Sequence, residues 1–123
     1  MEQAALSNRV IGLAIEVHRT VGPGLLERVY QECLCLELTE AGIPFRREVM
    51  VPVLYKAHTI EMGLRADILV DDAILLEIKA VASIVPAHEA QILTYLRMSG
   101  IRVGFILNFH AHRLKDGLRR FVV

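Results

Sequence analysis

The sequence predicts an α/β domain, with a mixed β-sheet that carries helices on its faces. Its 123 residues suit one domain of common size, 1–123, and no repeat or low-complexity linker divides them. Hydrophobic residues make up 54% and charged residues 23%, which is enough for a full core. The apolar patterns follow the order helix, helix, three strands, helix, strand, strand. A meander followed by a crossover helix would lay the next strand parallel to one of the first three.

Three segments have helical periodicity. The first covers about residues 2–19 and is broken by Gly-Pro-Gly at 22–24. The second covers about residues 25–41 and stops at Gly42. The third covers residues 86–99, because proline is tolerated in the first helical turn and a glycine follows at position 100.

Strand-like segments fill the rest of the chain. The first three cover about residues 45–55, 60–70 and 73–81, and a very apolar strand covers 102–109. A short hairpin tail ends the chain. Pro52 predicts an edge strand or a bulge in the first of these strands.

Charged side chains interrupt two of the predicted strands. Asp67 lies in the apolar run 66–70, and Glu77 and Lys79 lie in the run 73–81. Burying two carboxylates and an ammonium is costly without partners. Two acids and a lysine are a minimal set for holding a divalent metal and activating a water beside it. A structural ion pair between Asp67 and Lys79 explains the residue types equally well.

The turn after the second strand determines whether a metal site can form. Residues alternate faces along a strand, so Glu77 and Lys79 share one face. A two-residue loop at 71–72 leaves Asp67 on the other face, whereas a three-residue loop at 71–73 places Asp67 opposite Glu77. A bulge would have the same effect.

Two helices offer further polar groups to the same place. In the third helix Gln91 and Tyr95 share a face with His88, and in the second helix Glu27 and Tyr30 share a face. Each has an ordinary explanation when taken alone. Tyr95 can be core, Gln91 a hydrogen-bonded neighbour of the core, and Glu27 an acid that complements the helix dipole.

The overall charge excludes a general binder of polyanions. Lys+Arg and Asp+Glu both count 14, whereas affinity for phosphates comes largely from basic residues. Contact with nucleic acid therefore needs a local patch or metal ions. The mean hydropathy of +0.42 is high for a small monomer and predicts apolar surface covered by a partner or by a second copy in a homo-oligomer.

We expect a cytoplasmic protein that does not engage membranes. The first residues carry no secretory signal, and no uncharged apolar stretch reaches about 18 residues. Cys33 and Cys35 do not face each other on a helix, which predicts free thiols in a reducing compartment. A zinc site built from the histidines lacks a thiolate pair or a helix-borne His-x-x-x-His, so surface histidines are the better explanation.

Four motifs occur in order along the chain. They are Gly24-x-x-Glu27-x-x-Tyr30, Asp67, Glu77-x-Lys79 and Gln91-x-x-x-Tyr95. This set, which covers the chain nearly end to end, resembles the GxxExxY family of small bacterial and archaeal proteins, within the PD-(D/E)xK nuclease-like superfamily. Ala66 stands where the superfamily name has proline, a residue that constrains the backbone and takes no part in the chemistry.

The resemblance implies a restriction-endonuclease-like α-β-β-β-α-β core around a metal site. By it, Asp67 and Glu77 would bind Mg²⁺ or Mn²⁺, with the carbonyl of Ile78 as a possible further ligand. Lys79 would orient or help deprotonate the attacking water and offset charge on the phosphate. Oxygen ligands suit hard cations, and a bound metal lowers the pKa of its water, so the chemistry is consistent with the residue types.

The resemblance also assigns roles to the helical residues. Gln91 would position Lys79, the water or the substrate. Glu27 would face the same cavity and serve a second metal if one binds. Tyr30 and Tyr95 complete the set as supporting residues.

Two classes of function follow. The first is a metal-dependent nuclease that hydrolyses phosphodiester bonds in DNA or RNA by a metal-activated water. The second is a catalytically inactive binding or assembly module that keeps the nuclease fold. Cleavage that depends on Mg²⁺ or Mn²⁺ distinguishes them.

Overall fold

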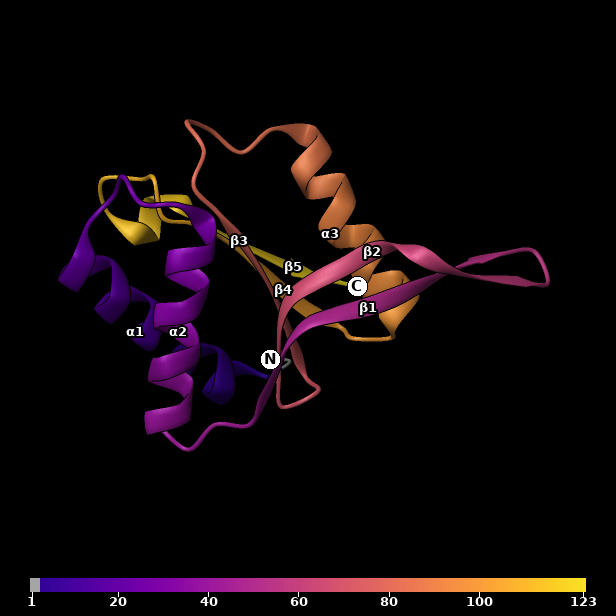
Figure 1. Ribbon diagram of the computed structural model, residues 1–123, viewed down its shortest axis with the longest axis horizontal. Coiled ribbons are helices and arrows are strands. Elements are labelled where there is room, and N and C mark those ends of the chain that lie inside the picture. Colours follow the sequence, from indigo (N-terminus) through magenta and orange to yellow (C-terminus); the bar gives the residue numbers. More distant parts are fainter. Residues whose placement is uncertain (1–2) are drawn as a thin grey trace.

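The computed structural model describes residues 3–123 and confirms the predicted α/β architecture. Figure 1 shows α1 and α2 side by side against one face of a twisted sheet, with α3 on the other. The elements are α1 (Ala4–Val21), α2 (Glu27–Glu40), β1 (Phe45–Tyr55), β2 (His58–Val70), β3 (Ile74–Lys79), α3 (Pro86–Ser99), β4 (Val103–Asn108), the 3₁₀ turn η1 (Leu114–Gly117) and β5 (Leu118–Val122).

The strands form one mixed sheet in the order β1-β2-β3-β4-β5. The first three are the expected antiparallel meander, β4 runs parallel to β3, and β5 returns antiparallel to β4. The helix α3 is the crossover that a parallel pair requires. The element order contains the predicted restriction-endonuclease-like core, preceded by α1 and followed by β5.

The helices differ from their predicted limits by a few residues. The predicted start of the first helix, residue 2, lies outside the described residues. Helix α1 continues to Val21 and ends where Gly22 adopts a left-handed φ of 71°. Helix α2 begins at Glu27, two residues late, because Leu26 is extended with φ −73° and ψ 151°. The limits of α3 agree with the prediction.

The second and third strands also differ slightly from the prediction. Strand β2 begins two residues early, because a tight hairpin pairs Tyr55 with His58. Strand β3 is shorter at both ends. Ala73 belongs to the turn, and the N–H of Ala80 donates to the side chain of Glu27 at 3.1 Å.

Both features that Pro52 predicted are present. Strand β1 is an edge of the sheet, and its register with β2 shifts between Val51 and Val53. Figure 1 shows the outer part of this hairpin projecting from the body of the molecule. We call residues 53–62 the hairpin arm. Its exposed large hydrophobic side chains are Leu54, Tyr55, Ile60 and Met62.

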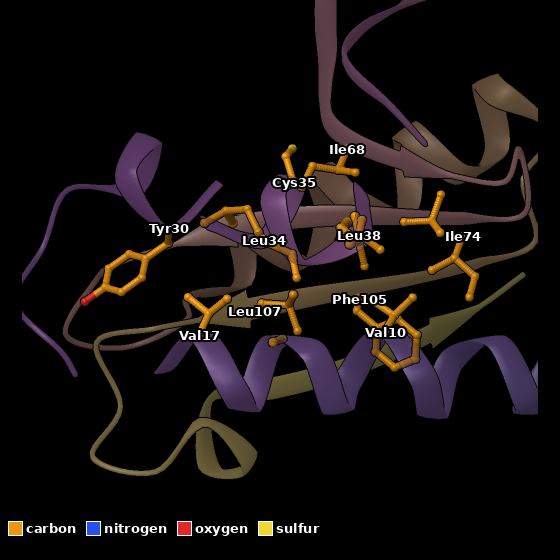
Figure 2. Packing of buried hydrophobic residues seen from close by; sticks show 14 of the residues in the cluster. Val10, Val17, Tyr30, Leu34, Cys35, Leu38, Ile68, Ile74, Phe105 and Leu107 are labelled. Atoms are coloured by element: carbon orange, nitrogen blue, oxygen red, sulfur yellow. The ribbon is translucent and has the colours of Figure 1, made fainter. Parts of the chain in front are cut away.

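Two apolar cores cover the two faces of the sheet. Figure 2 shows the larger, in which Val10 and Val17 of α1 and Leu34 of α2 pack on strand residues such as Phe105. The smaller lies beneath α3. The central strands β3 and β4 are almost entirely buried and therefore have nearly continuous apolar sequences.

The thiols of Cys33 and Cys35 are free, as predicted. Cys35 is buried and Cys33 is half-buried. Among residues 3–123, no helix combines the length and the apolar character needed to cross a membrane.

Candidate active site

The turn between β2 and β3 has the three-residue form that a metal site requires. Val70 pairs with Ile74, so residues 71–73 form the loop. The pairing continues to Ile68 and Leu76, and directly beyond it the side chains of Asp67 and Glu77 interact with each other. The sequence left two registers open, and the structure has the one that brings these carboxylates together.

Hydrogen bonds from two elements fix Asp67 in place. Its Oδ2 accepts the N–H of Ile78 at 2.7 Å, so the side chain takes the place of a ladder bond to β3. Its backbone oxygen accepts Nε2 of Gln31 on α2 at 3.1 Å. Gln31, a buried amide that the sequence analysis missed, could have been noticed as a polar residue beside Tyr30 on the inner face of α2.

Glu77 is the most unusual group in the site. It is only 4% exposed, and its Oε1 has no hydrogen-bond partner among the described residues. Burial, followed by the nearby charge of Asp67, raises the pKa of Glu77 to about 9. Burial also raises the pKa of Asp67. The metal-free pair therefore retains a proton at neutral pH, because the buried Glu77 cannot easily ionise beside the half-buried carboxyl group of Asp67.

Lys79 lies beside both carboxyl groups without forming an ion pair. Its charge lowers the pKa of Asp67 and of Glu77 against the stronger effect of burial. No acid in the described part of the chain lies within 4.0 Å of its ammonium group. The structure thus contains no Asp67–Lys79 salt bridge, the alternative explanation of this pattern.

The end of β4 anchors the end of β3. The N–H of Phe109 donates to the backbone oxygen of Lys79 at 2.8 Å. The buried side chain of Asn108 bonds both backbone groups of Val81, at 2.9 and 3.1 Å. The backbone on both sides of Lys79 is therefore held by β4, which limits the positions its side chain can reach.

Helix α3 contributes Gln91 and Tyr95, as predicted. Tyr95 is 4% exposed, and burial raises its pKa above the usual range. Its hydroxyl interacts with the backbone of Arg65. His88, expected on the same face, instead caps the helix: its Nδ1 accepts the N–H of Val85 at 3.1 Å.

Tyr30 lies outside the cleft and supports it from behind. Its hydroxyl donates to the oxygen of Gly22 at 2.6 Å and accepts the N–H of Leu25 at 3.1 Å. Its ring stacks on Phe109 with centroids 4.5 Å apart. These contacts hold the loop that leads into α2, and so they position Glu27 at the first residue of that helix.

One cleft of about 460 Å³ gathers the acids, Lys79 and two residues of α3. The lining residues that the sequence predicted are Glu27, Asp67, Glu77, Ile78, Lys79, Gln91 and Tyr95. Four further lining residues, all from the hairpin, were not predicted: Met50, Gly63, Leu64 and Arg65. No local pattern identifies these four, because the fold of β1 on β2 brings them to the cleft.

The donor set fits a hard divalent cation. The carboxylates of Asp67 and Glu77 and the carbonyl of Ile78 are all oxygen ligands, which Mg²⁺ and Mn²⁺ prefer. The unpartnered Oε1 of Glu77 is a buried acceptor that a cation would satisfy. Within residues 3–123 no three His, Cys, Asp or Glu side chains are arranged around a common metal position. Glu27 therefore does not act as a third carboxylate ligand to the same ion in this geometry.

These features define a class of protein: an α/β domain with two carboxylates and a lysine in a cleft on its central strands. The family model described as the PD-(D/E)XK nuclease superfamily matches residues 4–121. The chain belongs to this superfamily. No curated protein and no solved structure gives a significant match to it.

Proposed function

We propose that this protein is a metal-dependent nuclease of the GxxExxY type, which hydrolyses phosphodiester bonds in DNA or RNA. The observation that carries the proposal is the buried, unpartnered Oε1 of Glu77 opposite Asp67 and beside Lys79. A buried Glu77 beside a half-buried Asp67, both with raised pKa values, is unfavourable for folding, and a bound cation would relieve that cost.

Asp67, Glu77 and the carbonyl of Ile78 hold Mg²⁺ or Mn²⁺ in this proposal. When bound, the metal supplies a water of lowered pKa and neutralises charge that develops on the phosphate. The main chain of Ile78 keeps Asp67 turned toward Glu77 through its 2.7 Å hydrogen bond. The ammonium of Lys79 orients the attacking water and balances charge on the phosphate.

The other cleft residues position these groups. Gln91 is exposed on α3 and offers its amide to the water or to the phosphate. Tyr95 lines the cleft from the side of α3, where its hydroxyl interacts with the backbone of Arg65. Glu27 borders the cleft from the first turn of α2 and holds Ala80 N–H after β3, so we assign it a positioning role and a second metal only if one binds.

Cleavage of labelled single- and double-stranded DNA and RNA, with Mg²⁺, Mn²⁺ or EDTA, tests this function. We expect cleavage with metal only, and we expect Lys79→Ala to lower its rate by about 10²-fold or more. Lys115→Ala, which removes an exposed lysine outside the cleft, is the matched control and should cleave normally. Absence of metal-dependent cleavage of every substrate contradicts the proposal. Full activity of Lys79→Ala contradicts the role given to Lys79.

A binding or assembly module is the second candidate, and the exposed apolar side chains of the hairpin arm favour it. Met62 is 75% exposed and Leu54 is 61% exposed. Such side chains are typical of surfaces that a partner or a second copy covers, so we propose a homo-oligomer for either function. Light scattering tests this, because a solution mass near 13.8 kDa contradicts an obligate oligomer.

We also propose a cytoplasmic location. The free thiols of Cys33 and Cys35 suit a reducing compartment.

A further inference from the structure

A second, apolar cavity lies next to the candidate active site. Its volume is about 430 Å³. Its floor consists of buried side chains of the three antiparallel strands, and its far wall comes from the end of α3. Its lining residues include Val49, Met50, Ala66, Leu75, Met98 and Ser99. We call it the apolar pocket.

The apolar pocket and the cleft are continuous. Met50 lines both. On β2, Ala66 of the pocket directly precedes Asp67 of the cleft, and on β3 Leu75 precedes Glu77 by two residues on the same face. Alternate residues of a strand lie about 7 Å apart, which is comparable with the separation of a phosphate from the base of the same nucleotide. A nucleotide whose phosphate reaches Glu77 can therefore place its base in the apolar pocket.

The rim of the apolar pocket supplies polar groups for such a base. Arg46 and Asp72 form an exposed ion pair there, with 2.7 Å between Nη2 and Oδ1. The guanidinium offers donors and the carboxylate offers acceptors. Ser99 adds a hydroxyl on the opposite side. A cavity with an apolar floor and as much polar as apolar exposed surface suits a planar heterocycle that has hydrogen-bonding edges.

Charge around the cleft argues for recognition through bases. Only Arg65 and Lys79 among the cleft residues are basic, and three acids accompany them. Five arginines elsewhere in the described chain are engaged in salt bridges with acids. Duplex binding depends largely on many contacts between cations and phosphates. Contacts with unpaired bases add affinity that does not come from basic side chains.

We propose that the apolar pocket binds an unpaired nucleobase of the substrate strand, so that the protein acts on single-stranded or locally unpaired nucleic acid. This inference rests on the proposed nuclease function and specifies its substrate class. Met50 lines both cavities, so a nucleotide with its phosphate in the cleft and its base in the apolar pocket would lie against it.

Binding of fluorescent single-stranded oligodeoxynucleotides tests the proposal, with one abasic nucleotide moved stepwise along the strand. The full chain carrying Lys79→Ala serves as parent in Mg²⁺, so that the strand stays intact. We expect the abasic nucleotide to weaken binding by about tenfold at one position, because only there does it remove the base whose apolar surface the pocket buries. We expect a duplex of the same sequence to bind more weakly than the single strand.

Val49→Trp should fill the apolar pocket from β1, where an aromatic side chain suits a strand. In the parent background it should weaken binding of the intact strand by about tenfold and remove the effect of the abasic nucleotide. Val53→Trp is the matched control, because this valine of the same strand lines neither cavity. It should behave as the parent does. Met98→Trp fills the pocket from the opposite wall if Val49→Trp does not fold.

Several results would overturn the proposal that the apolar pocket binds a base. The abasic nucleotide could weaken binding equally at every position, or at none. A folded pocket-filling variant could bind the strand with unchanged affinity, or the duplex could bind more tightly than the single strand. A pocket-filling variant that breaks an oligomer at unchanged affinity would show that the pocket is a subunit contact. Metal-dependent cleavage by the wild-type chain separates these failures from failure of the nuclease proposal itself. The abasic scan needs no pocket variant, so it gives a result in every case.

Discussion

The carboxyl pair of Asp67 and Glu77 is unfavourable for the metal-free fold. Each group lies in a strand where an apolar residue would pack without an electrostatic cost, and Glu77 leaves one oxygen without a partner. Buried polar groups of this kind are typical of functional sites, where binding supplies the missing interaction. The free energy of unfolding should therefore depend on pH and on bound metal through this pair.

Glu77→Gln should reduce the pH dependence of stability in EDTA. Folding raises the pKa of Glu77 from 4.5 to about 9, so its favourable contribution is complete below pH 4.5 and is lost as the pH rises toward 9. The free energy of unfolding of the wild type should therefore fall over this range. One pKa unit corresponds to about 1.4 kcal/mol, so near pH 9 the free energy of unfolding of Glu77→Gln should exceed that of the wild type by more than about 1 kcal/mol.

Urea unfolding at a series of pH values measures this difference. Mg²⁺ should stabilise the wild type increasingly as the pH rises, because metal ligands must lose their protons, and it should stabilise Glu77→Gln far less. If the free energy of unfolding changed with pH in the same way in the wild type and in Glu77→Gln, Glu77 would not be a buried group that ionises.

At the scale of elements, two contacts set the positions of the helices that border the cleft. The hydroxyl of Tyr30 holds the loop before α2. Gly104 lets α3 approach β4 closely, since a Cβ there would lie 3.1 Å from Ile92 Cδ1 and 3.2 Å from the backbone oxygen of Leu75. Glu27, Gln91 and Tyr95 depend on these contacts although neither contact reaches the cleft.

Tyr30→Phe keeps the stacked ring and removes the hydroxyl. We expect a loss of about 1–2 kcal/mol in the free energy of unfolding, because Gly22 and Leu25 lose a buried partner. Tyr55→Phe, on the exposed hairpin arm, should change stability by less than about 0.5 kcal/mol. Equal effects in urea unfolding would show that the Tyr30 hydroxyl does not support the loop.

Gly104→Ala should press α3 away from the sheet. We expect a loss of about 1–3 kcal/mol in stability, together with lower nuclease activity at conditions where the variant is fully folded. Gly12→Ala is the matched control: a Cβ there meets nothing within 4 Å, and the change should stabilise α1 by about 0.5–1 kcal/mol. Unchanged stability and activity of Gly104→Ala would contradict the importance of this close approach.

The sequence predicted most elements because their periodicity and breakers are local. The limits of β1 and α3 agree with the structure, and the spacing of Asp67 from Glu77 restricted the turn to two registers. The sequence could not show the change of inward face along β1. Phe45 packs on the larger core and Val49 on the smaller. Between them Glu48 adopts a left-handed φ of 53°, a conformation unusual for glutamate that no local signal predicts.

The same limit applies to the site. The acids and Lys79 were predicted because charges stand out in apolar strands. Gln31 was missed, since its role is to hold backbone that only the folded chain brings to it. Arg65 was missed because its place in the cleft depends on how the hairpin bends.

At the scale of the whole molecule, charge balance limits how nucleic acid can bind. The formal net charge is zero, and only two basic side chains line the cleft. The cleft of the described chain therefore offers few of the cation–phosphate contacts on which duplex binding depends. Metal ions and apolar contacts must supply the rest of the affinity.

Binding of a single strand should depend only weakly on salt. For single strands the slope of log K against log salt is about −0.7 for each phosphate neutralised, so two cleft cations predict a slope of about −1.4. Titration of the Lys79→Ala parent at several salt concentrations should give a still shallower slope, near −0.7. A slope steeper than about −4 would indicate a basic surface elsewhere and contradict the account.

A crystal of the full chain soaked in Mn²⁺ would reveal the metal site itself. We expect anomalous density between the carboxyl groups of Asp67 and Glu77, within reach of the Ile78 carbonyl and beside Lys79. Glu77→Gln crystals should lose that density. An ordered site with no density at saturating Mn²⁺, or Mn²⁺ bound only elsewhere, would contradict the metal site and the nuclease mechanism built on it.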